Sequence, residues 1–170
     1  MKKFRIYIGG VGGVGKTVIG QELAHRNKME HFSGSWIMMK LCNTNSREGL
    51  SEMPTTKKEL IEKVSYPNFV IKKRRIIVDG HCGLLLEQVK CFDKFIFLTA
   101  PAEIIKYRRK QREEQRRNVD TQTILREQKE YELKISKIEQ EHGVEFIRFA
   151  NIANINKTCE LIEKILNFKD

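Results

Sequence analysis

Short hydrophobic runs alternate with longer amphipathic stretches along this 170-residue chain. The runs are rich in isoleucine, valine and phenylalanine, which favour strands, and glycine or polar residues close them. We expect strands at residues 4–8, 74–79, 94–99 and 144–149, with a weaker one at 29–33. Because helical patterns separate these strands, we expect a three-layer α/β/α protein with a parallel sheet of about five strands.

Apolar residues recur at helical spacing between the strands, as with Ile19, Leu23 and Ala24. A serine, either Ser33 or Ser35, is expected to cap the helix after the second strand. The polar residues 43–57 are expected to be irregular. The helices that we expect cover residues 16–27, 35–41, 57–64, a basic segment from Pro101 onward, a segment from Asp120 or Thr121 to Gly143, and residues 155–166.

Composition and charge limit the partners. The net charge of +10 favours a polyanion, whether a phosphorylated small molecule, a nucleic acid or an anionic membrane surface. No apolar run approaches the roughly 18 residues of a membrane span, so we expect a cytoplasmic protein without one. The four cysteines lack CxxC spacing, which favours neither a zinc site nor a disulfide framework. The length favours one domain over residues 1–170.

A glycine-rich segment follows the first predicted strand. Residues 10–17, GVGGVGKT, match the pattern G-x-x-x-x-G-K-[ST], which binds nucleoside triphosphates where it joins a strand to a helix. Glycines let backbone N–H groups reach phosphate oxygens, the lysine neutralises the β- and γ-phosphates, and the threonine ligates Mg²⁺. We therefore predict a P-loop NTPase fold that binds ATP and Mg²⁺ through Gly10, Gly12, Gly13, Val14, Gly15, Lys16, Thr17 and Val18.

Asp79 ends the clearest buried strand after the first one. The carboxyl ends of parallel strands meet the ligand at one edge of the sheet, so this carboxylate is expected beside the P-loop. There it would hold Mg²⁺ together with Thr17, directly or through water.

The helix from Pro101 becomes strongly basic. Arg109, Arg112 and Arg116 have the spacing i, i+3, i+7 and share a helical face, with Arg117 adjacent. Phosphoryl transfer needs cations around the migrating group, and a mobile segment could deliver them. The alternative is a solvated charged helix with intrahelical pairs such as Glu113 with Arg117.

The order of these features resembles nucleoside monophosphate kinases, and archaeal-type adenylate kinases and adenylate kinase-like proteins in particular. The matching segments are the P-loop, VDGH at 78–81, FLTAPAEII at 97–105 and the arginines that follow, so the resemblance spans nearly the whole chain. It implies a single kinase domain with an acceptor-binding subregion at residues 29–72 and a short lid at 109–120.

The resemblance also implies residue roles. Lys16 and the lid arginines Arg112, Arg116 and Arg117 would be catalytic. Ser33 in FSGS, Arg47 and His81 would contact the acceptor substrate. Asn151, in the loop ANIAN, lies where backbone groups of the family contact adenine.

Three positions depart from the family pattern on the acceptor side and in the P-loop. Gly12 replaces a proline, Met38 replaces an arginine, and the D-G segment continues with His81 instead of the usual x-P-R. The acceptor site therefore has fewer evident cations than a standard AMP pocket.

We expect an enzyme that moves the γ-phosphoryl group of Mg·ATP to a nucleoside monophosphate, with AMP favoured. One alternative is an RNA-linked adenylate kinase-like ATPase in ribosome assembly, which the net charge favours. Another is a kinase for a different small-molecule or polynucleotide acceptor, for which His81 could act as a base. The sequence leaves open ATP against GTP, the binding of RNA and the oligomeric state.

Overall fold

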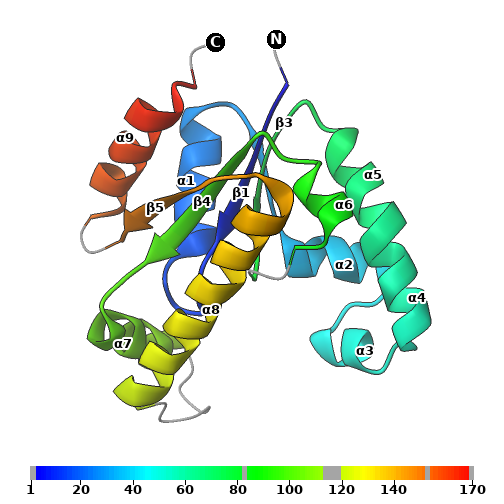
Figure 1. The fold of residues 1–170 in the computed structure, drawn as a ribbon, viewed down its shortest axis with the longest axis horizontal. Helices are drawn as coiled ribbons and strands as arrows, with labels where there is room; N and C mark the ends of the chain where they lie inside the picture. Colours follow the sequence, from blue (N-terminus) through cyan, green and yellow to red (C-terminus); the bar gives the residue numbers. More distant parts are fainter. Residues whose placement is uncertain (1–2, 82–83, 113–119, 152–153, 169–170) are drawn as a thin grey trace.

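The structure is a computed structural model that describes residues 3–81, 84–112, 120–151 and 154–168. At its centre lies a parallel sheet of five strands in the order β2-β3-β1-β4-β5 (Figure 1). The expected three-layer α/β/α fold is confirmed. The strands are β1 (Phe4–Gly9), β2 (Glu30–Ser33), β3 (Arg75–Asp79), β4 (Lys94–Thr99) and β5 (Phe146–Ala150).

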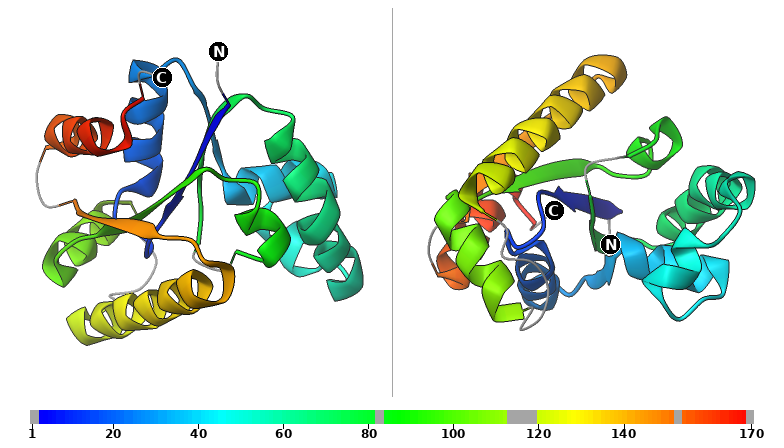
Figure 2. Two further views of the ribbon diagram at one scale, coloured as in Figure 1. Left: turned by 45° about the horizontal axis from the view of Figure 1, so that its top comes forward. Right: turned by 90° about the horizontal axis from the view of Figure 1, so that it is seen from below.

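Helices cover both faces of the sheet (Figure 2). Helices α1 (Lys16–Arg26) and α9 (Ile155–Leu166) lie on one face, and α8 (Thr121–His142) crosses the other. Helix α7 (Ala102–Arg112) packs against α8. The remaining helical segments are α2 (Gly34–Cys42), α3 (Arg47–Ser51), α4 (Thr55–Leu60), the π-helical η1 (Ile61–Ser65), α5 (Tyr66–Ile71) and α6 (Leu86–Val89).

Alternating residues of the central strands supply two hydrophobic cores, one for each face. Ile6 and Ile8 of β1 pack with residues of α1 and α9, whereas Tyr7 between them packs with residues of α2, α5 and α8. Ile77 and Val78 of β3 divide between the two cores in the same way. This alternation is expected of a parallel sheet that is buried on both faces.

Several predicted helix ends are confirmed in detail. Ser33, not Ser35, caps α2: its hydroxyl accepts a hydrogen bond from the backbone N–H of Trp36 over 3.2 Å. Helix α8 begins after Asp120, which accepts from Thr123, and ends at Gly143 with φ of +64°. Glycine is favoured there because left-handed backbone is costly for residues that carry a Cβ atom.

The prediction for residues 43–57 is wrong. This polar stretch contains α3 and the start of α4, and the predicted helix at 57–64 continues through η1 into α5. A capping serine starts α3, since Ser46 Oγ accepts from the N–H of Gly49 over 3.0 Å. The short α6 was also not predicted.

Both chain termini lie at the end of the sheet where the strands begin (Figure 1). Among the described residues no helix is long and apolar enough to cross a bilayer. Cys42, Cys91 and Cys159 are buried free thiols, and Cys82 lies outside the described residues.

Candidate active site

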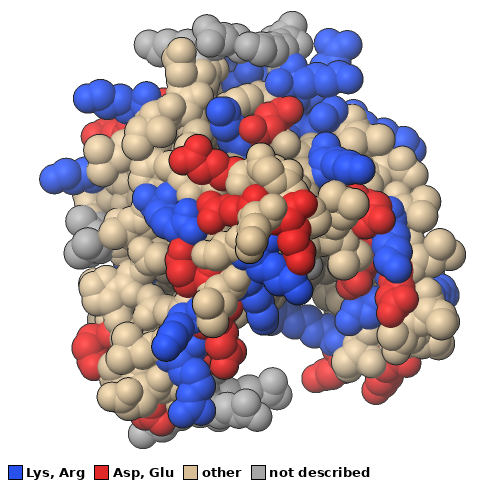
Figure 3. Space-filling view, viewed as in Figure 1, with Lys and Arg blue, Asp and Glu red and all other residues tan. Residues whose placement is uncertain are grey.

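A cleft of about 960 Å³ opens at the carboxyl end of the central strands. The loop at residues 10–15 lies at one side of it, between β1 and α1. Residues of α2, α3, α4, η1 and α5 form the opposite side. Figure 3 shows the cleft as a hollow at the lower edge of the molecule, with Lys and Arg side chains inside it.

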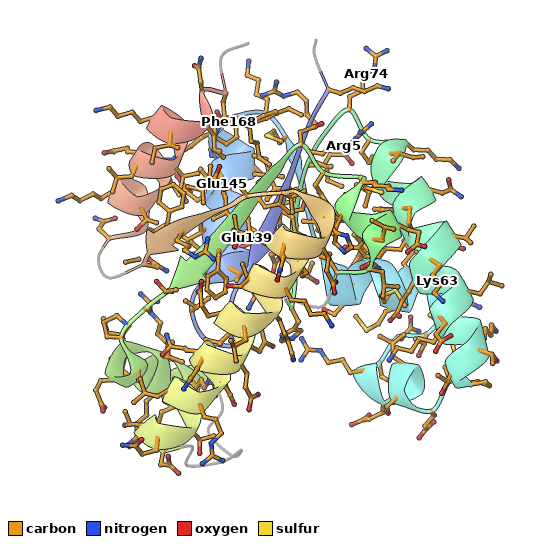
Figure 4. All side chains as sticks on the ribbon, viewed as in Figure 1. Arg5, Lys63, Arg74, Glu139, Glu145 and Phe168 are labelled. Atoms are coloured by element: carbon orange, nitrogen blue, oxygen red, sulfur yellow. The ribbon has the colours of Figure 1, made fainter. Side chains whose placement is uncertain are left out.

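Not every cation of this basic protein belongs to the cleft. Arg5 and Arg74 lie at the opposite end of the sheet, and Lys63 lies on the outer surface of η1 (Figure 4). The charge around the cleft therefore comes from particular residues that the fold brings there.

The P-loop has the backbone that its glycines permit. Gly13 and Gly15 have φ values of +84° and +101°, which residues with a Cβ atom rarely adopt. Gly15 is also the N-cap of α1, so no side chain caps the first turn of this helix. Its N-terminal N–H groups and partial positive charge are suited to a phosphate group.

Lys16 folds back over the loop. Its ammonium group donates hydrogen bonds to the carbonyl oxygens of Gly10, over 2.7 Å, and Val11, over 2.9 Å. The residue is only 9% exposed, yet it lines the cleft. A bound polyphosphate would offer this cation stronger partners than two neutral carbonyl groups.

Three further side chains donate hydrogen bonds to carbonyl groups of the loop. The oxygen of Val14 accepts from Arg108, over 3.1 Å, and from the side-chain amide of Asn151, over 2.8 Å. The oxygen of Gly12 accepts from Nε of Arg109 over 2.9 Å. These hydrogen bonds hold the loop in place, because side chains of the protein bind its carbonyl oxygens.

The side chain of Asn151 lies against the P-loop. Its side chain is 2% exposed and lies under the P-loop, where a Cβ atom on Gly15 would come within 2.5 Å of Nδ2. The Asn151 side chain therefore supports the loop, and the adenine contact expected for the segment 150–154 stays a prediction. Residues 152–153 lie outside the described residues.

Asp79 lies beside the P-loop, as predicted. The Thr17 hydroxyl donates to Oδ2 of Asp79 over 3.0 Å, and Nε2 of His31 lies 2.8 Å from Oδ1. Asp79 is 4% exposed. A hydroxyl and a carboxylate are oxygen ligands of the kind Mg²⁺ prefers, so these two residues fit the ion. Within the described chain no group of three or more His, Cys, Asp or Glu residues could hold a metal, and phosphate oxygens and water would complete the shell.

The side of the cleft opposite the P-loop carries mixed charge. Arg47 and Lys58 line it together with Glu62. The Arg47 side chain is exposed and makes no hydrogen bond or ion pair with any described residue. Ser33 also lines the cleft, although its hydroxyl is engaged as the cap of α2.

His81 lies where the two sides meet. Its Nδ1 is 2.8 Å from the hydroxyl of Tyr131, and its carbonyl oxygen accepts from Tyr7 over 2.5 Å. The surrounding protein and the nearby cations Lys16 and Arg47 lower the pKa of His81, so the ring is neutral at physiological pH. Burial raises the pKa of Tyr66, which also lines the cleft and stays protonated.

The predicted lid arginines cannot be assigned to the cleft. Arg112 ends α7 and its side chain is not described, and Arg116 and Arg117 fall in 113–119, outside the described residues. Instead, Arg108 and Arg109 of the same helix contact the P-loop. Arg109 lies on the same predicted helical face as Arg112. Its spacing in the sequence therefore indicated a place near the P-loop.

The family model for AAA_18, described as an AAA domain, matches residues 6–134. No curated protein matches the sequence of the chain.

Solved structures of similar fold include several small-molecule kinases. A shikimate kinase from Bacteroides thetaiotaomicron is 15% identical with a TM-score of 0.67, covering 96% of this chain and 98% of that chain. A shikimate kinase from Acinetobacter baumannii in complex with shikimate has the same identity and TM-score, covering 98% of this chain and 95% of that chain. A sugar kinase from Janibacter sp. HTCC2649 is 16% identical with a TM-score of 0.58, and the match covers 98% of this chain and 96% of that chain. At these identities the likeness shows the fold.

Proposed function

The chain belongs to the AAA_18 family of AAA domains, and from that premise we propose that it is an Mg·ATP-dependent kinase for a small anionic acceptor. The observation that carries this proposal is the distribution of groups in one cleft. The P-loop and Asp79 lie on one side and two cations, Arg47 and Lys58, lie on the other. We name these sides the donor half (residues 10–17 and Asp79) and the acceptor half (Ser33, Arg47, Lys58, Glu62 and Tyr66).

In the donor half the protein supplies position and charge, because phosphoryl transfer leaves it little covalent chemistry to perform. Lys16 would exchange the Gly10 and Val11 carbonyl groups for the β- and γ-phosphates. Thr17 and Asp79 would hold Mg²⁺, which when bound neutralises charge on the phosphate oxygens. Arg109 lies against the P-loop and lines the cleft, where its guanidinium also pairs with Glu127, and it would have to turn from Glu127 toward the phosphates to stabilise charge on the transferred group.

We propose AMP as the acceptor to be tested first. Its phosphate would bind to Arg47 and Lys58, which line the acceptor half of the cleft. A phosphate oxygen is already anionic, so this acceptor needs no general base. The fold shared with shikimate and sugar kinases supports a small-molecule acceptor more broadly.

Phosphoryl transfer to a hydroxyl group is a second candidate function, and His81 favours it. The ring lines the cleft in its neutral form, because its pKa is lowered, and a neutral imidazole can accept a proton from an alcohol. The same two cations would then bind a carboxylate or phosphate group of the acceptor.

Measuring nucleotide turnover by chromatography tests these proposals. The protein is incubated with Mg·ATP or Mg·GTP alone, then with AMP, CMP, UMP, GMP, dTMP, shikimate or a simple sugar. ADP formation that requires AMP, with two ADP formed per ATP consumed, supports the adenylate kinase-like activity. ADP formation that requires shikimate or a sugar supports transfer to a hydroxyl group.

The variant Lys16→Met is the control, because it removes the cation and keeps the aliphatic stem. Turnover that persists in this variant at the wild-type rate would come from a contaminating enzyme. Slow ATP loss that is indifferent to every acceptor would contradict the kinase proposal and favour the RNA-linked ATPase.

A further inference from the structure

We propose that His31 is a positioning residue that orients the carboxylate of Asp79 for binding Mg·nucleotide. The inference rests on the proposed nucleotide site but concerns a residue outside the P-loop motif. His31 belongs to β2, and its side chain contacts Asp79 of the donor half.

The strand register places the two side chains together. Ser33 is the register partner of Asp79 across the β2–β3 pair, and His31 precedes Ser33 by two residues. Residues two apart on a strand share a face, so His31 and Asp79 both lie on the face that α1 covers. Their side chains are only 11% and 6% exposed, and Nε2 lies 2.8 Å from Oδ1.

This contact divides the carboxylate between two donors. Oδ1 faces His31, whereas Oδ2 accepts from the hydroxyl of Thr17 over 3.0 Å. The terminal torsion of an aspartate is broad, so a carboxylate with one partner can rotate. Because His31 fixes Oδ1, Oδ2 is kept toward Thr17 and the first turn of α1, where the ion would lie.

Helix α1 leaves room for the His31 ring. A Cβ atom on Gly20 would come within 2.7 Å of both Cδ2 and Nε2 of His31. Gly20 lies in the interior of α1 and has no positive φ that would require glycine. Glycine at such a site destabilises a helix relative to alanine, so the close approach of His31 gives its presence a physical reason.

The proposal requires a particular proton position on the ring. For the ring to orient an ionised carboxylate, which only accepts hydrogen bonds, Nε2 of His31 has to be the donor. This requirement can be examined in the wild-type protein without any ligand. Nitrogen-15 NMR should find Nε2 of His31 protonated. An unprotonated Nε2 would overturn the proposal, because the ring could not then donate to Asp79.

The main test separates the metal-dependent part of nucleotide binding from the rest. The dissociation constant of a fluorescent ADP analogue is measured with Mg²⁺ and with EDTA, and the ratio of the two gives the gain from Mg²⁺. Residues that orient a metal ligand typically change metal affinity by about 10–100-fold when they are replaced. We expect His31→Leu to reduce the gain from Mg²⁺ by about tenfold and to leave binding in EDTA unchanged.

Three variants make the result specific. His31→Gln retains an N–H donor at similar reach and should restore most of the gain. Gly20→Ala should reduce the gain as His31→Leu does, because its methyl group displaces the ring. His25→Leu alters an exposed histidine of α1 and should leave both dissociation constants unchanged.

The outcomes separate the two proposals. A wild-type gain from Mg²⁺ that His31→Leu fully retains would overturn the role of His31 and leave the proposed function standing. A wild-type protein that binds the analogue no better with Mg²⁺ would overturn the proposed function and this inference with it. If His31→Leu does not fold, the NMR result and Gly20→Ala decide.

Discussion

The donor half and the acceptor half of the cleft are built in different ways. In the donor half the carbonyl oxygens of Gly10, Val11, Gly12 and Val14 all accept hydrogen bonds from side chains. In the acceptor half the Arg47 guanidinium is exposed and engages no described residue by a hydrogen bond or ion pair. The protein therefore holds the donor half in place, whereas the acceptor half leaves Arg47 available to bind a ligand.

The supporting elements differ in the same direction. The donor half lies between a buried strand and the 11-residue helix α1, and Asn151 and Arg108 hold its loop from other elements. The acceptor half rests on α3 and α4, of five and six residues, and on the π-helical η1. Short helices and π-helical turns depend on tertiary contacts for their stability and are frequent at functional sites.

This difference suggests a division of labour. Polyphosphate is the same for every nucleoside triphosphate, so a preorganised donor half lowers the cost of binding it. Arg47, which has no hydrogen bond or ion pair to a described residue, can become ordered around the acceptor when it binds, at a cost in side-chain entropy. Substitutions in the donor half should therefore have larger effects than those in the acceptor half.

The largest effect is expected from Lys16→Met. Removing this cation takes away a group that stabilises charge on the transferring phosphoryl group, and kcat should fall by about 10²–10³-fold. Initial rates of ADP formation measure this. The outer lysine of η1 supplies the matched control, since Lys63→Met removes an equal charge away from the cleft and should leave kcat unchanged. Equal losses in both variants would contradict a specific role for Lys16.

The second effect concerns the rigidity of the donor half. In Asn151→Leu the buried amide is lost and the Val14 carbonyl keeps Arg108 alone. The free energy of unfolding should fall by about 0.5–1.5 kcal/mol, the usual net contribution of one hydrogen bond, because the Val14 carbonyl still accepts from Arg108. Urea denaturation measures the loss. If Asn151→Leu unfolds like the wild type and KM for ATP is unchanged, the loop does not depend on this support.

The sequence predicts the donor half well because its chemistry is local. The pattern of residues 10–17 and the strand that ends at Asp79 place the loop, Lys16 and Thr17 without any knowledge of the rest of the chain. Parallel strands end at one edge, so Asp79 could be brought to the loop by reasoning alone. The five strands follow from the same local hydrophobic pattern.

The supports of the donor half could not be predicted, because they are contacts between distant segments. Asn151 lies 137 residues from Val14, and Arg108 lies 94 residues from it. His31 comes to Asp79 only through the register of β2 on β3. In the acceptor half the helix α3 was missed because residues 43–57 lack apolar periodicity, and the capping residue Ser46 was the available signal.

A smaller effect, confined to one substrate, is expected in the acceptor half. The variant Arg47→Gln should raise KM for the acceptor about tenfold, because a charged hydrogen bond to an anion is worth roughly 1.5–3 kcal/mol and the site is exposed. KM for ATP should change little. Steady-state kinetics with each substrate varied in turn measure both values. Arg74→Gln, at the far end of the sheet, is the matched control. A tenfold rise in KM for ATP would contradict the division into two halves.

The smallest effect lies at His81, where the two halves meet. The surrounding protein lowers the pKa of His81 most, and Lys16 of the donor half and then Arg47 of the acceptor half lower it further. NMR titration should therefore find the pKa of His81 below its ordinary value, raised more by Lys16→Met than by Arg47→Gln. Because the unfolded chain binds this proton more readily, the contribution of His81 to stability is present above pH of about 6.5 and is lost as the pH falls toward the folded pKa. His81→Gln should accordingly lose less stability than the wild type between pH 7.5 and 5.5. Equal changes in the pKa of His81 in Lys16→Met and Arg47→Gln would contradict this prediction. They would mean that Lys16 and Arg47 influence the charge of His81 to the same extent.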